Sequence, residues 1–259
     1  MNKSIALPDL VAFVSDCKPV AWNDLRCYQS GILYENVRNR LFQDQNWLCA
    51  YCESKISDCK SNKHNQRVEH FHSKSDQSNV QYDITFDWNN LIGVCLGGTE
   101  YKVKGLFEMP ENESCDVHKE SMESKSVINS KNWHGVVLFP PNIPDEVYFF
   151  DFELSTGKIV PNVTVCNKAI IEPNNFKTTL QLVQNTIDVF NLNCRRLNEA
   201  RREILYERER IINRAKSTNN IDMLKFIFSK WLNDPSLMYT STRRALLEES
   251  SIARKILNL

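Results

Sequence analysis

Residues 49–52 read Cys-Ala-Tyr-Cys, residues 68–71 read Val-Glu-His-Phe, and two further cysteines stand at positions 95 and 115. Two cysteines separated by two residues form a knuckle that can hold zinc, and structural zinc takes four ligands in a tetrahedron. We therefore expect one structural Zn²⁺ ion bound by Cys49, Cys52, Cys95 and Cys115. The residues between the pairs are then available for chemistry.

The second half of this site is interrupted, because 19 residues separate Cys95 from Cys115. Leu96-Gly97-Gly98 can still form a knuckle turn after Cys95, with the chain returning at Cys115. Two other interpretations stay open. Cys95 and Cys115 could be unrelated buried thiols, or Cys49 and Cys52 could form a redox pair, although no thioredoxin-like βαβ pattern surrounds them. The other cysteines lack zinc spacing and are expected to be core or surface thiols: Cys17, Cys27, Cys59, Cys166 and Cys194.

The composition of the 259-residue chain is ordinary for a soluble globular protein, with 42% hydrophobic and 25% charged residues. No apolar run approaches the roughly 20 residues that span a bilayer, and the first 14 residues lack the apolar region of a secretory signal. We therefore predict a cytoplasmic protein without membrane contact. In that reducing compartment, metal binding by cysteines is favoured over disulfides.

Hydrophobic periodicity predicts a small α/β core inside a mainly helical protein. The core, near residues 45–130, is expected to hold strands at 67–71 and 90–95 and a helix at 117–126 with Asp116 as its N-cap. A further β-hairpin is expected from strands 147–154 and 158–160 around a turn at 155–157. Helices are expected at 30–46, 176–192, 195–216, 221–232 and 242–257, and residues 53–66 are expected to form a loop. The fold class is α+β, with one unit at 1–130 and a second at 131–259.

The knuckle and its intervening residues resemble an HNH endonuclease of the ββα-metal fold. More narrowly, they resemble the PtuB-like subunits of Septu and of some retron anti-phage defence systems. The resemblance rests on a set of short segments and covers most of residues 30–210: Cys49 to Cys52, Val68 to Phe71, Trp88-Asn89-Asn90-Leu91, Cys95, Cys115 to Lys119, and Asn191 to Cys194 with Leu197 and Arg201.

The resemblance implies a role for each residue at a matching position. His70 would be the general base, and Glu69 and Asp116 would bind a catalytic Mg²⁺ ion, which prefers oxygen ligands. Asn90 would brace the hairpin and orient His70, while zinc would take no part in the chemical step. Neighbours on a regular strand point to opposite faces. Glu69 and His70 can therefore share a site only if the strand ends or twists there.

Some assignments stay open within this resemblance. His72 and His118 are alternative metal ligands, and Lys119 could contact phosphate or be an ordinary helix lysine. The chain also departs from the family pattern. Asp116 stands where His or Asn is usual, and Ser73 stands two residues after Phe71 where the family often has proline.

The charge distribution bears on how a substrate is held. The net charge is zero, which is unusual for a protein that binds nucleic acid alone. Residues 49–119 hold 8 Lys and Arg against 11 Asp and Glu, whereas residues 195–259 hold 14 against 8. Because phosphate affinity comes mostly from cations, the C-terminal segment or a partner protein is expected to hold the substrate. The arginine-rich helix at 195–216 is either a solvated helix with internal ion pairs or a phosphate-tracking or docking surface.

The resemblance implies a metal-dependent endonuclease that hydrolyses nucleic acid as the effector subunit of a PtuAB-type complex. Its expected partners are a PtuA-type ABC ATPase and, in retron systems, a reverse transcriptase with its DNA. The substrate could be DNA or an RNA such as tRNA. A second hypothesis is a non-catalytic zinc-bound adaptor that recruits nucleic acid or the ATPase. A third is a thiol–disulfide enzyme.

Overall fold

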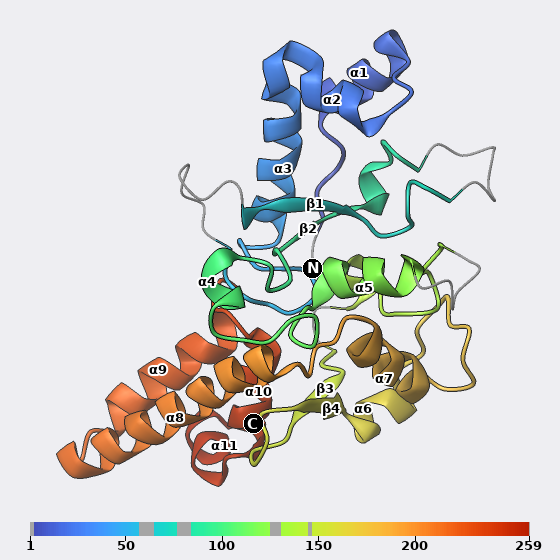
Figure 1. The fold of residues 1–259 in the computed structure, drawn as a ribbon. Helices are drawn as coiled ribbons and strands as arrows, with labels where there is room; N and C mark the ends of the chain where they lie inside the picture. Colours follow the sequence, from blue (N-terminus) through green and yellow to red (C-terminus); the bar gives the residue numbers. More distant parts are fainter. Residues whose placement is uncertain (1–2, 57–64, 77–83, 125–130, 145–146, 259) are drawn as a thin grey trace.

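The computed structural model describes residues 3–56, 65–76, 84–124, 131–144 and 147–258. Cys59 and His64 lie outside the described residues. Helices dominate, and each of two antiparallel hairpins forms a two-stranded sheet. Helices α1–α3 stand at one end of the molecule, the β1–β2 hairpin and α5 lie in the middle, and β3, β4 and α6–α11 form the other end (Figure 1).

The first end is built from α1 (Pro8–Cys17), α2 (Trp22–Cys27), a 3₁₀ turn (Tyr28–Gly31) and α3 (Ile32–Asp44). Proline suits the first position of a helix, where its missing N–H would have no partner in any case, and Pro8 begins α1 there. No element was predicted before residue 30. Helix α3 was predicted within two residues at each end, and it packs against both strands of the first hairpin.

The first hairpin pairs β1 (Arg67–His70) with β2 (Leu91–Val94), which follows a 3₁₀ turn at Trp88–Asn90. Both strands were predicted within a residue or two. Gly93 lies opposite Val68 in the sheet, and a Cβ atom on Gly93 would lie 2.9 Å from the Phe42 ring. A glycine at this position therefore lets α3 lie directly on β2. The Gln45 amide completes the contact by bonding the Gly93 backbone N and O atoms at 2.7 Å each.

After β2 the chain forms α4 (Tyr101–Lys104) and then α5 (Cys115–Ser124). The prediction that Asp116 is the N-cap of this helix was wrong. Cys115 has a φ of +58° and Asp116 already lies in the first helical turn. The Asp116 carboxylate therefore points to other partners, which belong to the site described below.

The other end begins with the hairpin of β3 (Phe150–Phe152) and β4 (Ile159–Pro161), after a 3₁₀ turn at Pro140–Asn142. The hairpin was predicted, but β3 is shorter than residues 147–154. The helices that follow are α6 (Val163–Lys168), α7 (Thr179–Val189), α8 (Arg195–Thr218), α9 (Ile221–Asn233), α10 (Thr240–Glu249) and α11 (Ser251–Leu257). The single helix predicted at 242–257 is two helices, because the Ser250 side chain caps α11 by accepting from Ala253 N.

Helix α8 is not simply a solvated helix. Its buried stripe combines Leu197 and Ile204 with two arginines, Arg201 and Arg208. The Arg201 guanidinium donates to Leu192 O at 2.8 Å, and the Arg208 guanidinium donates to Leu246 O at 2.8 Å. These arginines therefore satisfy buried carbonyls, while exposed Arg195 forms the expected i,i+4 ion pair with Glu199 at 2.7 Å.

The largest core cluster joins the four zinc-spaced cysteines to the C-terminal helices. The Tyr51 ring stacks on Phe190 at 3.8 Å, Cys115 N donates to Phe190 O at 2.9 Å, and Tyr239 N donates to Glu53 O at 3.0 Å. The division into units at 1–130 and 131–259 stays a prediction. Among the described residues, no helix has both the length and the apolar character needed to cross a bilayer.

Candidate active site

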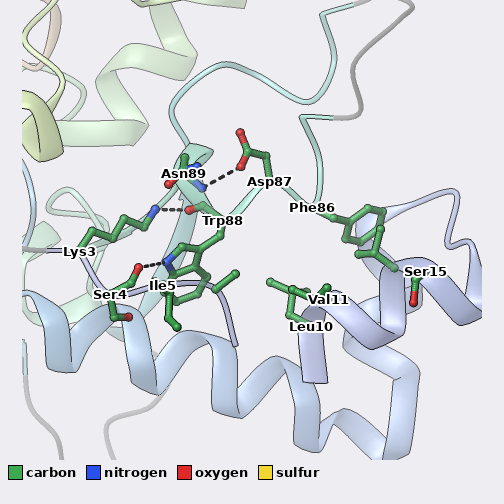
Figure 2. A pocket seen from close by; sticks show the side chains of 12 residues that line it. Lys3, Ser4, Ile5, Leu10, Val11, Ser15, Phe86, Asp87, Trp88 and Asn89 are labelled. Carbon is green, nitrogen blue, oxygen red and sulfur yellow. Dashed lines mark hydrogen bonds between the residues drawn. The ribbon is translucent and has the colours of Figure 1, made fainter. Parts of the chain in front are cut away.

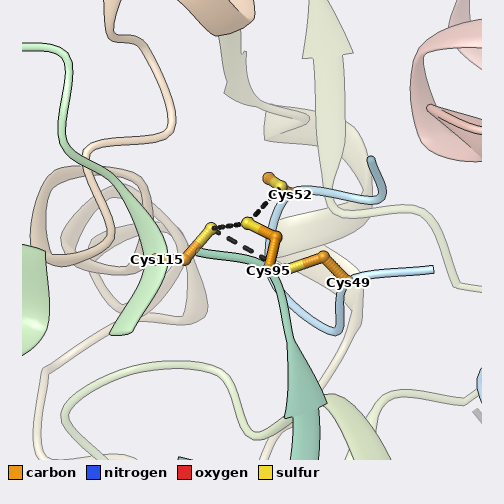
Figure 3. Close-up of side chains that lie close together, drawn as sticks. All are labelled: Cys49, Cys52, Cys95 and Cys115. Carbon is orange, nitrogen blue, oxygen red and sulfur yellow. Dashed lines mark hydrogen bonds between the residues drawn. The ribbon is translucent and has the colours of Figure 1, made fainter. Parts of the chain in front are cut away.

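The four cysteines predicted to hold zinc come together from three separate segments (Figure 3). Cys49 and Cys52 lie in the turns after α3, Cys95 follows β2, and Cys115 begins α5. Their ligand atoms all lie within 4.8 Å of one another. The Sγ–Sγ distances are 3.8 Å for Cys49–Cys115, 3.8 Å for Cys52–Cys95 and 3.7 Å for Cys95–Cys115. The predicted meeting of these cysteines is therefore confirmed.

The geometry of the cluster fits a tetrahedral metal and not a disulfide. Four sulfurs placed about 2.3 Å from one zinc ion are about 3.8 Å apart, whereas a disulfide requires about 2.05 Å. Hydrogen bonds from neighbouring thiols, first from Cys115, hold the pKa of Cys52 well below its usual value, while burial raises the pKa of Cys115 well above it. A divalent cation would compensate the charge that such a cluster acquires as its thiols ionise.

The interrupted knuckle is closed by the turn that the sequence predicted. Gly97 N donates to Cys95 Sγ at 3.4 Å, and Gly97 O accepts from Ser114 N at 2.9 Å, so the chain returns to the turn just before Cys115. Arg196 of α8 supports the same point by donating to Ser114 Oγ at 2.8 Å. The charges of nearby cysteines raise the pKa of Arg196 although burial opposes them.

A cleft of about 410 Å³ lies beside the first hairpin, and we refer to it as the cleft. It is lined by residues of α2, α3, β1, the loop after β1 and α5. Its acidic residues are Glu69, Asp116, Glu120 and Glu123, and His70 lines it too. Strand β1 ends at His70, and at this strand end the neighbours Glu69 and His70 both border the cleft. The structure thus brings together three of the four residues predicted to act.

His70 is held in one orientation by its surroundings. Its Nε2 atom lies 2.9 Å from Thr85 O, and the Trp22 ring meets the imidazole edge-on at 4.5 Å between centroids. A carbonyl oxygen can only accept, so Nε2 carries the proton and Nδ1 keeps its lone pair. Burial lowers the pKa of His70 to about 4, with smaller contributions from the charges of Lys74, Lys119 and Arg26. The imidazole is therefore neutral at neutral pH.

The two carboxylates face cations. Asp116 Oδ2 lies 3.3 Å from an Arg67 guanidinium nitrogen, and the Lys119 ammonium contacts Glu69 Oε1. Asp116 Oδ1 is buried and has no hydrogen-bond partner among the described residues. Burial, followed by the charge of Glu69, raises the pKa of Asp116 to about 7. The two carboxyl groups thus repel each other where little water can reach them. A divalent cation bound between them would stabilise their charged forms.

Asn90 is not among the described residues that line the cleft, and its side-chain hydrogen bonds go to backbone atoms. Its Oδ1 accepts from His72 N at 2.7 Å, and its Nδ2 donates to His72 O and Ile84 O at 2.9 Å each. Asn90 thereby fixes the loop that follows β1, and the Thr85 carbonyl fixes the imidazole. The alternative ligands are engaged elsewhere. His72 Nε2 lies 2.7 Å from an Asp76 oxygen, and His118 Nδ1 lies 2.8 Å from Val189 O.

Two basic residues of the site were missed or underrated from the sequence. Arg67 was not singled out, although it stands two positions before Glu69 on a strand and therefore shares its face. Lys119 was considered only as a phosphate contact or an ordinary helix lysine. It is 3% exposed, and it donates to His70 O and Phe71 O at 3.2 Å each. Its place four residues after Cys115, on the helix face of Cys115, was the available signal.

A larger hollow of about 680 Å³ lies between the N-terminal segment, α1 and residues 86–89 (Figure 2). Its walls are mostly apolar, with Leu10, Val11 and Trp88 among them. The Lys3 ammonium donates to the carbonyls of Trp88 and Leu91, and Trp88 Nε1 donates to Ser4 O at 2.7 Å. Among the residues that the structure describes, no histidine or cysteine lines this hollow, so the cleft beside β1 is the better candidate for chemistry.

Comparison with known proteins yields one informative relative. No protein-family model matches the chain. The chain is 36% identical over 258 residues to a curated Escherichia coli protein named "Retron Ec83 putative HNH endonuclease". The alignment covers 100% of this chain and 97% of the relative. The similarity therefore extends over the N-terminal helices, the cysteine cluster, the cleft and the C-terminal helices alike.

Proposed function

The chain belongs to the retron-associated family of HNH endonucleases, and from this membership we propose that it hydrolyses phosphodiester bonds of nucleic acid in the cleft. In this proposal β1, β2 and α5 form a ββα-metal core inside the mainly helical protein. One observation carries it. A neutral imidazole and two carboxylates, contributed by the end of a strand and the first turn of a helix, line the same hollow beside a four-cysteine cluster.

His70 acts as the general base in this proposal. The Thr85 carbonyl holds the proton on Nε2, so the Nδ1 lone pair is available to take a proton from the attacking water. The low pKa of the buried ring keeps His70 unprotonated before the reaction. Trp22 limits rotation of the ring, and the Lys119 ammonium fixes the backbone carbonyl of His70 itself.

Glu69 and Asp116 would hold a catalytic Mg²⁺ ion. Carboxylate oxygens suit this cation. The buried, unbonded Asp116 Oδ1 and the raised pKa of Asp116 fit a site where Arg67 and Lys119 compensate the carboxylate charge only in part, so that a further cation would be stabilised. When bound, the ion would offset negative charge developing on the phosphoryl and leaving oxygens. Arg67 and Lys119 now neutralise part of the carboxylate charge and would orient both side chains. Hydrolysis by this route would leave a 5′-phosphate.

The four cysteines would hold Zn²⁺ in a structural role. Their sulfurs have tetrahedral spacing, and a closed set of four cysteine ligands has no open position for substrate. The exposed fractions of the four residues range from 0% for Cys115 to 6% for Cys95. Zinc bound here would hold β2 and α5 together and so fix where Asp116 lies relative to β1. It would supply no group to the chemical step.

We also propose that the chain is the effector subunit of a PtuAB-type complex with a PtuA-type ABC ATPase. A retron reverse transcriptase and its DNA would be further partners, in keeping with the retron named for the E. coli relative. The zero net charge supports a role for a partner, since long-range attraction of the whole chain to nucleic acid is weak. The adaptor hypothesis needs the four cysteines but neither His70 nor Asp116.

The decisive experiment compares His70→Ala with His118→Ala. Both variants remove an imidazole that bonds a backbone carbonyl, but only His70 lines the cleft. Each protein is purified with the products of its neighbouring genes. Each is then given Mg²⁺ with plasmid DNA, single-stranded DNA or tRNA, and its zinc content is measured. We expect His70→Ala to keep zinc and lose cleavage, whereas His118→Ala keeps both.

Two outcomes would contradict parts of the proposal. Cleavage by His70→Ala at the parental rate would remove His70 from the mechanism. If the parental complex binds nucleic acid but cleaves none of the three probes, the non-catalytic adaptor becomes the better description. The probe that is cut also decides between DNA and RNA as the substrate.

A further inference from the structure

Within the described ranges, the basic residues around the cleft are of two kinds: some pair with its carboxylates and others do not. Its basic residues are Arg26, Arg67, Lys74 and Lys119. Two of these neutralise the carboxylates that would hold the metal, because Arg67 pairs with Asp116 and Lys119 contacts Glu69. Those two cations are therefore engaged within the protein. The other two require a different explanation.

Arg26 and Lys74 have no acidic partner among the residues that the structure describes. Both side chains are exposed. They come from different elements, since Arg26 stands in the last turn of α2 and Lys74 lies in the loop after β1. They nevertheless border one hollow together with His70. An unneutralised pair of cations beside a catalytic cleft favours an anionic ligand at that place.

Arg26 is positioned by aromatic side chains. Its guanidinium lies over the Tyr34 ring at 5.2 Å, and the Tyr34 ring meets Trp22 at 6.1 Å. Trp22 in turn contacts the His70 ring at 4.5 Å. A guanidinium over an aromatic face keeps its N–H donors available at the edge, and that planar fork matches phosphate oxygens. The aromatic contacts therefore hold a phosphate-binding group at a fixed position relative to the proposed base.

We propose that Arg26 and Lys74 form a phosphodiester-binding subsite that holds the nucleic-acid backbone on the His70 side of the cleft. This inference rests on the proposed function, because it places the phosphates that flank the bond to be cut. Contacts of this kind position a strand without reading its sequence. The N-terminal helices then have a direct role in substrate binding, and affinity does not depend only on the C-terminal arginines or on a partner.

Binding measured as a function of salt tests the subsite. In a His70→Ala background, which prevents cleavage, fluorescence anisotropy is recorded with labelled single-stranded DNA, duplex DNA and RNA, each in two unrelated sequences. The variants are Arg26→Gln and Lys74→Gln. The matched controls are Arg210→Gln and Lys168→Gln, two exposed cations that do not line the cleft. Thermal unfolding of each variant confirms that it is folded.

For every probe that the His70→Ala reference protein binds, we expect each cleft substitution to weaken binding roughly tenfold. The slope of log affinity against log salt should fall by about one for each lost phosphate contact. Arg26→Lys should retain the slope but bind less tightly, because lysine lacks the planar fork. Tyr34→Leu should weaken binding while leaving the slope nearly unchanged, since the charge of Arg26 remains.

The outcomes separate this inference from the proposed function. If the unsubstituted protein cleaves nucleic acid while the cleft variants match the controls in affinity and in salt dependence, the subsite is refuted and the nuclease assignment stands. If neither the parent nor its complex binds or cleaves any probe, both are refuted. Loss of affinity for one probe sequence alone would also overturn the subsite, because backbone contacts act on all sequences alike.

Discussion

Replacement of Gly97 by alanine tests whether the backbone turn after Cys95 is what closes the interrupted knuckle. Gly97 has a φ of +61°, in the left-handed region. A Cβ atom there would lie 2.4 Å from Ser114 O and 2.8 Å from Val117 Cγ2. The Ser114 carbonyl belongs to the backbone just before Cys115, so it cannot move away without displacing a ligand of the cysteine cluster.

The magnitude follows from two costs. A residue with a Cβ atom in the left-handed conformation is less stable by about 1–2 kcal/mol, and one extra carbon forced into a packed site costs about 1–3 kcal/mol. The free energy of unfolding should therefore fall by about 2–5 kcal/mol. That is a large part of the roughly 5–15 kcal/mol typical of a whole domain. Displacement of Cys115 should also speed release of the zinc that we propose the four cysteines bind.

Gly105→Ala is the matched control, since it lies in the same insertion between Cys95 and Cys115. Its φ is −75°, and the nearest atom to a new Cβ would be Lys102 O at 3.6 Å. The assays are urea unfolding at equilibrium and zinc release to a coloured chelator. We expect a change within about 0.5 kcal/mol for Gly105→Ala. Equal stability and equal zinc release for the two variants would refute the role assigned to the Gly97 turn.

Three further perturbations have expected outcomes. Arg196→Met removes the half-buried guanidinium that donates to Ser114 Oγ, so release of the proposed zinc should be faster and the free energy of unfolding lower by about 1–3 kcal/mol. Arg195→Met, at the exposed neighbouring position, should match the parent, and equal release rates for the two variants would contradict this. Lys119→Met leaves Glu69 and two buried carbonyls without their cation. The free energy of unfolding, measured with urea, should therefore fall by about 3–5 kcal/mol. A decrease smaller than that of Lys102→Met would show that Lys119 has no structural role. Burial lowers the pKa of Lys3 from 10.5 to about 7, so between those pH values the unfolded chain binds a proton that the folded chain does not, and stability rises with pH by up to about 1.4 kcal/mol per unit. That rise, measured by urea unfolding at several pH values, should be smaller in Lys3→Met; an unchanged slope would show that Lys3 titrates normally.

The sequence was most informative where chemistry and local geometry coincide. The Cys49 knuckle, the glycine turn after Cys95 and the strands ending at His70 and Val94 were predictable, because each depends on residues that are close in sequence. The mainly helical character with a small hairpin sheet could be predicted from periodicity for the same reason, and α3, α8 and α9 were expected with nearly their observed ends. Glu69 and His70 line one cleft because β1 ends at His70, an exception that alternation alone could only state as a condition.

What the sequence did not predict depends on contacts between distant segments. The pairing of Arg67 with Asp116 joins a strand to a helix, and the Thr85 carbonyl that orients His70 lies in a loop. Buried Arg201 and Arg208 look like solvated helix residues until α10 and the Leu192 carbonyl are in place. The contribution of α2 to the cleft was missed for a different reason, because a six-residue helix gives too short a periodic signal.

The shared core around the cysteines sets the order in which the protein can be assembled. Cys49 and Cys52 leave the ribosome well before Cys115, and the aromatic Phe190 and Tyr239 that close over the cluster are made later still. A metal ion bound by the four cysteines, as proposed, would therefore enter most easily before these later segments have folded over the cluster. Once the last helices dock, loss or exchange of zinc bound as proposed would require part of this core to open. The zinc supply during translation would then influence how many copies acquire the ion.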